Sequence, residues 1–244
     1  MSSGILSCTT YAFMPNRLSY CGPDKNRDLF EYGATQTVDA GLKEILIDFQ
    51  TMWPYLRLIA SSNQTNDPFD EKVVEAYWIG NELLEQTPIQ EFYRHLAETM
   101  NFKKRLDGKS LEYLAGKLPL GAKPHHTFHV LNVFWRTGHH AVQHTVETMD
   151  NCRVSWGKIV AARPEEFDVR SRPLELVDQK LRLGRPADRT IQRSLDDKTF
   201  IRRPNIGDWV SFHWGFACEI LTLRQVRNLA HYTREAITLA NLTI

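Results

Sequence analysis

The segment Asn205–Ile220, which reads NIGDWVSFHWGFACEI, decides the fold of the C-terminal part of the chain. Its Gly-Asp pair at 207–208 is a turn signal, and Trp209–Trp214 then alternates between apolar and polar residues as a strand does. The more apolar face of this strand carries Val210, Phe212 and Trp214. Because successive side chains of a strand point to opposite faces, His213 is expected at the outer end of the strand, away from the core.

The residues after this strand predict a second strand and a long helix. Gly215 breaks the first run, as a glycine does at a bulge or a tight bend. Alternation then resumes on Phe216, Cys218 and Ile220, which assigns Cys218 to the core. From Thr222 to Asn241 the apolar residues recur at three- and four-residue steps, the pattern of an amphipathic helix.

The segment Asn151–Ile159, which reads NCRVSWGKI, opens a series of short strands. Strands are predicted at Arg153–Ala162, Phe167–Val177 and Gln179–Leu183, with a less regular element at Asp188–Phe200. Several short strands followed by a helix are typical of a small Greek-key barrel of the OB type.

These two segments together resemble the HypC/HupF family of small chaperones for nickel–iron hydrogenase maturation. That family begins with M-C-L-A-I-P-G-K-V, and here Cys152, Gly157 and Lys158 match it in order. Its other signature, G-D-Y-V-x-V-H-x-G-F-A, is similar to residues 207–217. The resemblance covers about residues 152–244 and implies the same fold, an OB-like β-barrel with a C-terminal helix.

The chain departs from the family pattern in four respects. The family cysteine follows the initiator methionine, whereas Cys152 lies inside the chain. Arg153 replaces the family leucine and Trp156 the family proline. The segment between the two signatures, about Pro164 to Pro204, is longer and more basic.

The resemblance also implies a function and a site. The family carries an Fe(CN)2CO fragment from a HypD-type assembly partner to the large subunit of the hydrogenase. By this resemblance Cys152 is the iron-binding thiolate and His213 the second ligand or contact. Thiolate is a soft ligand and imidazole a borderline one, and two protein ligands leave most of the coordination sphere of iron open. An open sphere suits a carrier that must accept and release its cargo.

Composition and charge divide the chain near residue 150. The sequence has 244 residues, of which 42% are hydrophobic and 24% charged, as in a globular protein. Residues 1–151 carry 14 Lys and Arg against 18 Asp and Glu, whereas residues 152–244 carry 16 against 11. We therefore expect an α+β protein with an all-helical domain at 1–150 and the barrel with its helix at 151–244.

No apolar run approaches a membrane span, and the N-terminus lacks the pattern of a secretory signal. The four cysteines have no CxxC spacing and are expected to be thiols. These features favour a cytoplasmic protein with no membrane partner.

The N-terminal part resembles an uncharacterised helical domain that accompanies hydrogenase-maturation modules. Residues 1–24 are expected to be irregular because Pro15, Gly22 and Pro23 punctuate them. Helices are predicted at 25–33, 39–61, 70–86, from 88 onward and at 110–117, with Pro54 kinking or dividing the second.

A histidine-rich segment, Pro124–Asp150, is predicted to be one helix that runs into the barrel. It carries His125, His126, His129, His139, His140 and His144. Histidines four residues apart can hold one metal ion, so this segment is a candidate for a second site that binds a metal or haem, or for a site that handles protons. Cys21 is a further candidate ligand. The alternative interpretation has the rings hydrogen-bonded in a domain interface and Cys21 packed at a helix entrance.

Two alternative functions follow from the same residues. One is an OB-type nucleic-acid binder that uses the basic middle segment and exposed Trp209 or Trp214 for stacking. Near-neutral net charge, +1, argues against nucleic acid. The other is a metal- or haem-dependent enzyme centred on the histidine-rich segment. The sequence leaves open whether the N-terminal part is catalytic.

Overall fold

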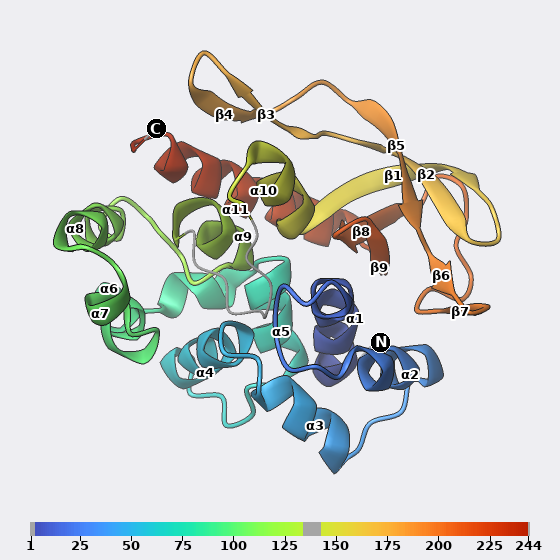
Figure 1. The fold of residues 1–244 in the computed structure, drawn as a ribbon, viewed down its shortest axis with the longest axis horizontal. Helices are drawn as coiled ribbons and strands as arrows, with labels where there is room; N and C mark the ends of the chain where they lie inside the picture. Colours follow the sequence, from blue (N-terminus) through green and yellow to red (C-terminus); the bar gives the residue numbers. More distant parts are fainter. Residues whose placement is uncertain (1–2, 134–142, 244) are drawn as a thin grey trace.

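A computed structural model describes residues 3–133 and 143–243, and it confirms the predicted α+β class (Figure 1). Helices fill the described chain as far as Cys152, strands begin at Ser155, and a long helix ends the chain. The first elements are α1 (Gly4–Arg17), α2 (Asn26–Thr35), α3 (Ala40–Ile47), α4 (Met52–Ser62), α5 (Glu71–Trp78), η1 (Glu82–Gln86) and α6 (Ile89–Arg94). They are followed by η2 (His95–Thr99), α7 (Phe102–Arg105), α8 (Gly108–Gly116), α9 (His126–Phe128), η3 (His129–Val133) and α10 (Val146–Cys152).

The prediction of an irregular segment at 1–24 was wrong, because α1 occupies most of it. This helix is buried on nearly every side, so its sequence has no amphipathic period to reveal it. Gly4 permits close packing, since a Cβ there would lie 2.2 Å from the carbonyl oxygen of Phe69. Pro15 falls in the last turn of the helix. Helix α1 packs against α2 and α5 and contacts the strands β8 (Trp209–His213) and β9 (Phe216–Leu221).

Two predicted helices are divided, each for a local reason. The segment 39–61 forms α3 and α4, but the break lies at 48–51, and Pro54 sits in the first turn of α4, where proline is tolerated. The histidine-rich segment is not one helix: α9 and η3 are short, and residues 143–145 are not helical before α10 begins. His139 and His140 lie outside the described residues.

Five strands form a partly open barrel in the C-terminal part. They are β1 (Ser155–Ala162), β2 (Glu166–Ser171), β5 (Ala187–Gln192), β8 (Trp209–His213) and β9 (Phe216–Leu221), and they neighbour one another in the cyclic order β1-β2-β5-β9-β8. The junction of β5 with β9 consists of one parallel pair, Gln192 with Phe216, whereas the other junctions are longer antiparallel ladders. This order is that of a five-stranded Greek-key barrel.

Two small hairpins extend from the barrel: β3 (Leu174–Val177) with β4 (Lys180–Leu183), and β6 (Ser194–Leu195) with β7 (Lys198–Thr199). The predicted strand 167–177 is therefore two strands. Pro173 lies between them, and proline lacks the N–H that a continuous ladder needs.

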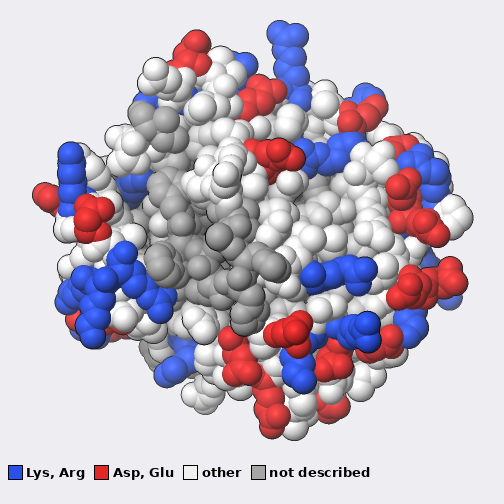
Figure 2. All heavy atoms as spheres, in the orientation of Figure 1, with Lys and Arg blue, Asp and Glu red and all other residues white. Residues whose placement is uncertain are grey.

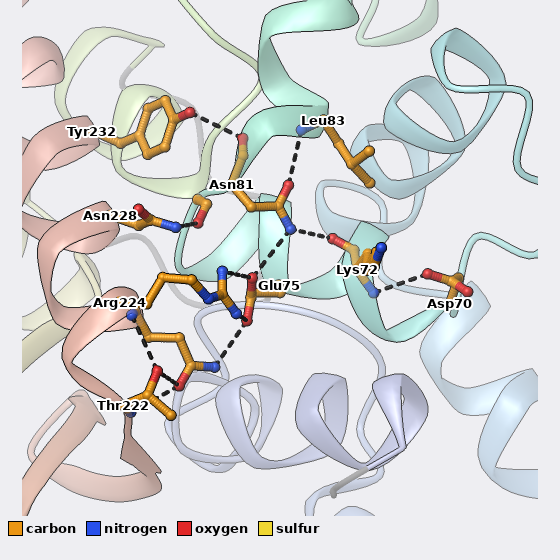
Figure 3. A network of polar contacts seen from close by, with 11 residues as sticks. Asp70, Lys72, Glu75, Asn81, Leu83, Thr222, Arg224, Asn228 and Tyr232 are labelled. Atoms are coloured by element: carbon orange, nitrogen blue, oxygen red, sulfur yellow. Dashed lines mark hydrogen bonds and ion pairs between the residues drawn. The ribbon is translucent and has the colours of Figure 1, made fainter.

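Helix α11 (Leu223–Ala240) joins the barrel to the N-terminal helices. A capping box between Thr222 and Gln225 begins it, and its buried face packs on α9, η3 and β4. At its first turn Arg224 donates two hydrogen bonds of 2.8 Å to Glu75 on α5, and Gln225 donates a third (Figure 3). None of the helices in the described part of the chain combines the length and hydropathy needed to cross a bilayer.

The apolar core does not stop at residue 150. One small cluster fills the barrel, including Phe167, Val210 and Phe212. The largest cluster instead runs from the N-terminal helices into Val154, Cys218 and Leu221 and along α11. Cys218 is buried, as predicted. The helices and the barrel therefore share an extensive apolar interface.

Candidate metal centre

Three side chains that could bind a metal ion meet at this interface. They are His126 from α9, Cys152 at the end of α10 and His213 at the end of β8. One potential ligand atom from each lies within 4.8 Å of those of the other two. The structure thus brings together the two residues singled out in the barrel motifs and adds one histidine from the helical part.

Cys152 is held by the elements on either side of it. A capping box between Thr145 and Thr148 begins α10, which ends at Cys152. The next residue, Arg153, is 1% exposed and donates from Nε and Nη2 to the carboxylate of Asp150 at 2.9 and 2.6 Å. Asp150 also accepts from the main-chain N–H of Leu174 at the start of β3. This buried pair ties the end of the helix to the barrel.

His213 is buried, with 2% of its surface exposed, and does not lie at an outer edge as the sequence predicted. The reason is that α1 covers the second face of β8, so both faces of this strand are buried. The Nδ1 of His213 lies 2.7 Å from the main-chain carbonyl oxygen of Tyr11. A carbonyl can only accept, so Nδ1 carries the proton and Nε2 carries the lone pair that could bind a metal.

His126 makes hydrogen bonds with both ring nitrogens. Its Nε2 donates to the main-chain carbonyl of Cys152 at 2.8 Å, and its Nδ1 accepts from the hydroxyl of Tyr77 at 3.2 Å. Burial, and next the neighbouring His213, lower the pKa of His126 well below its ordinary value. The ring is therefore neutral at physiological pH. It can ligate a metal ion only by giving up one of these two hydrogen bonds.

A cavity of about 50 Å³ borders the cluster. Its lining includes the three candidate ligands together with Cys21, His129 and His144. Tyr77, Trp78 and Trp214 supply aromatic walls, and the ring of Trp78 lies 4.5 Å from that of His126 and 5.7 Å from that of His213, between centroids. Four residues of the predicted second site, Cys21, His126, His129 and His144, therefore share one cavity with the barrel motifs.

The histidines of that predicted site other than His126 have different hydrogen bonds and exposure, and His125 lies outside the cavity lining. His125 is the N-cap of α9, where its Nδ1 accepts from the N–H of Thr127, and its ring stacks on Tyr232. Burial lowers the pKa of His125 to about 3. His129 lies 3.1 Å from the hydroxyl of Tyr55 through Nδ1, and His144 is exposed on the segment before α10.

Tyr11 is a functional candidate that the sequence reasoning missed. Its carbonyl orients His213, and its hydroxyl lies 2.8 Å from Ser211 Oγ and 3.0 Å from the carboxylate of Glu219. Burial raises the pKa of Glu219, an effect that hydrogen bonds from Ser7 and Tyr11 oppose. Glu219 also lines a groove of about 980 Å³ between α1, α5 and β9, so Tyr11 separates this groove from the candidate metal centre. Only the assignment of 1–24 to a helix could have revealed this role.

The basic middle segment is largely paired within the molecule. Arg189 binds Asp150, Arg182 binds Glu175, and Lys198 binds Glu31. On the face drawn in Figure 2, positive and negative side chains are interleaved around the molecule. Trp209 and Trp214 are half-buried rather than exposed, and the ring of Trp214 packs on Tyr20 with centroids 4.7 Å apart.

Fold and cluster define a two-part α+β protein in which two buried histidines and a half-buried cysteine meet between a helical part and a small barrel. The chain belongs to the family of unknown function DUF6390, whose model matches residues 1–244. No curated protein and no solved structure matches the chain. One family model thus spans the helices and the barrel together.

Proposed function

We propose that this protein is a metallochaperone for nickel–iron hydrogenase maturation, which carries an Fe(CN)2CO fragment bound by Cys152, His213 and His126. Its clients in this proposal are the hydrogenase large subunit and a HypD-type assembly partner. The observation that carries the proposal is the meeting of Cys152 and His213 with a third candidate ligand, His126, beside a small cavity. These two residues lie 61 positions apart, and each comes from one of the two motifs that resemble the HypC/HupF family.

The donor atoms suit iron. A soft thiolate and borderline imidazoles bind low-spin iron, and a hydrogen bond to a backbone carbonyl orients His213 in the way that ligating histidines are oriented in metal sites. His126 is a weaker ligand, because its ring must first leave Tyr77 or the Cys152 carbonyl. Because these hydrogen bonds compete with the metal for the His126 ring, they favour release of the metal, which a carrier needs.

The cavity fits a small cargo. A space of about 50 Å³ admits a few water-sized groups, which is the size class of diatomic ligands and not of a macrocycle. A haem macrocycle needs a pocket of the size that takes drug-like ligands, about 300 Å³ or more. The cavity therefore favours an iron fragment over haem.

The helical part has a direct role in this proposal. It supplies His126 as a ligand and covers His213 through α1, so it shields the cargo from water. Four cysteines that are all thiols suit a reducing compartment, and we place the protein in the cytoplasm. No catalytic activity is assigned to the helical part.

The test is anaerobic purification from cells that contain hydrogenase-maturation proteins, followed by iron analysis and infrared spectroscopy. The wild type should carry iron and show cyanide and carbonyl stretching bands, and Cys152→Ala should lose both. Cys8→Ala is the matched control, because Cys8 is a buried thiol outside the cavity lining. A wild type with no iron and no bands, or a tight and salt-sensitive affinity for a labelled oligonucleotide, would overturn the proposal.

A further inference from the structure

We infer that Cys21 is a fourth protein ligand, which closes the centre around a bare divalent metal ion as a Cys2His2 site. This inference rests on the proposed metal centre and adds a thiolate to it. Cys21 belongs to the turn between α1 and α2, and its residue lines the same cavity as His126, Cys152 and His213. Two thiolates and two imidazoles around one ion are the donor set of tetrahedral zinc sites.

The turn that carries Cys21 is built to a fixed shape. The side-chain amide of Asn16, itself 3% exposed, donates to the carbonyls of Cys21 and Pro23. Gly22 has φ +80°, and a Cβ at that position would lie 2.4 Å from the ring of Phe49. Only glycine fits there, so the backbone on either side of Cys21 is held close to the helical core.

The same turn is anchored to the metal centre. Tyr20 packs its ring on Trp214, the residue that follows His213. Tyr77, whose hydroxyl binds His126, and Cys21 line the same cavity. Cys21 therefore shares a cavity wall with the candidate ligands.

Cys21 stands outside the group of atoms that lie within 4.8 Å of one another. The three-residue centre therefore has an open side toward the cavity, and the Cys21 thiol must turn inward to complete a tetrahedron. A bare divalent ion has no ligands of its own, so a fourth protein ligand strengthens its binding. An iron fragment brings its own small ligands, which fill the cavity in place of the Cys21 thiol. Ligation by Cys21 therefore distinguishes a bare ion from an iron fragment.

Cobalt reports the number of thiolates directly. The full-length apo protein, kept reduced and anaerobic, is titrated with Co²⁺ while the thiolate-to-cobalt charge-transfer band and the tetrahedral visible bands are recorded. Wild type should bind one ion with two thiolates and release two protons, as measured by calorimetry in buffers of different ionisation enthalpy. In Cys21→Ala and Cys21→Ser the charge-transfer intensity per cobalt should fall by about half, with one proton released.

The variants separate this inference from the proposed function. Cys21→Ser preserves the size of the side chain, so a common effect of both Cys21 variants reports ligation and not packing. Cys8→Ala should leave the spectrum unchanged. If both Cys21 variants keep the full charge-transfer intensity while Cys152→Ala loses intensity, Cys21 is not a ligand and the three-residue centre stands. If wild type binds no cobalt and carries no iron, the metal centre itself is wrong.

Discussion

The main-chain N–H of Trp214 donates a 2.8 Å hydrogen bond to the carbonyl oxygen of Asn151. These two residues are the chain neighbours of His213 and Cys152. This main-chain hydrogen bond fixes the separation between the backbones of the two candidate ligands. A side-chain substitution at either position leaves the backbone separation unchanged. The turn at Trp214 reaches this position because Trp214 and Gly215 both adopt positive φ, at +51° and +71°. Ligand variants can consequently be interpreted as losses of a donor atom.

Replacement of Cys152, His213 or His126 by alanine should each weaken metal binding. Changing an outer-shell partner typically lowers metal affinity by about 10- to 100-fold. The loss of affinity here should be larger, because a donor atom itself is removed. Competition of the apo protein against a chelator for Co²⁺ measures the affinity. Cys218→Ala is the control, since Cys218 is buried in the core and lies outside the cavity lining. Equal affinities for Cys152→Ala and Cys218→Ala would contradict the assignment.

Removal of bound metal should lower the melting temperature without unfolding the protein. The apolar clusters of the barrel and of the helices involve many residues that do not touch the centre, so folding does not depend on the ion. The stabilisation should grow with metal concentration, as expected for a ligand that binds only the folded state. Far-ultraviolet circular dichroism and thermal scans with and without chelator test this. A chelated protein that loses its helical signal at 25 °C would show that the metal is structural.

Arg153→Leu restores the residue of the HypC/HupF pattern and should nevertheless destabilise this protein. It removes both hydrogen bonds that Arg153 donates to Oδ1 of Asp150, which is 6% exposed and keeps Arg189 as an ionic partner. Leaving a buried charge without any partner costs about 3–5 kcal/mol, so the cost here should be below that range but above the cost of breaking an exposed pair. Urea denaturation gives the free energy of unfolding. The matched control is Arg170→Leu, which breaks an exposed pair with Asp188 and should cost at most about 1 kcal/mol.

The contact between Glu75 and Arg224 should make stability depend on pH. Burial alone would raise the pKa of Glu75, but hydrogen bonds from Arg224, Asn81 and Gln225 outweigh it and lower the pKa below its ordinary value of 4.5. A carboxyl with a lowered pKa stabilises the fold fully above its ordinary pKa and loses this contribution as the pH falls through the folded-state value. Glu75→Gln should therefore lower the melting temperature at pH 7 and lower it less at acid pH.

Thermal scans of Glu75→Gln and wild type from pH 7 downward measure that difference. The exposed Glu82, close to Glu75 on the same groove, supplies the control variant Glu82→Gln. A difference between Glu75→Gln and wild type that stays constant with pH would show that the ionised carboxylate is not what holds α5 to α11.

Local patterns in the sequence predicted β1, β8, β9 and α11. The alternation at 209–214 placed Val210 and Phe212 in the barrel core, and the three- and four-residue steps after Thr222 gave the helix. The alternation after Gly215 also placed Ile220 on the buried face, but Ile220 is 40% exposed because a bulge between Ala217 and Glu219 shifts the pattern. The same reasoning assigned Cys218 to the interior. These elements have one strongly apolar face. Such a face gives the sequence a hydrophobic period that can be recognised without knowing which elements pack against it.

The candidate centre depended on contacts that no local pattern contains. His213 was expected outside because α1, which covers it, has no period of its own. His126 and Cys152 come from separate short helices, and the expectation of one continuous helix could not bring their side chains together. Cys21 and Cys152 are far apart in the chain, so only the packed tertiary structure places them on one cavity.

His213 comes from β8, whereas His126 and the carbonyl of Cys152 that it binds come from elements earlier in the chain. The three candidate donors are therefore synthesised at different times on the ribosome. A growing chain has no complete set of donors until β8 has been made and has folded against α1.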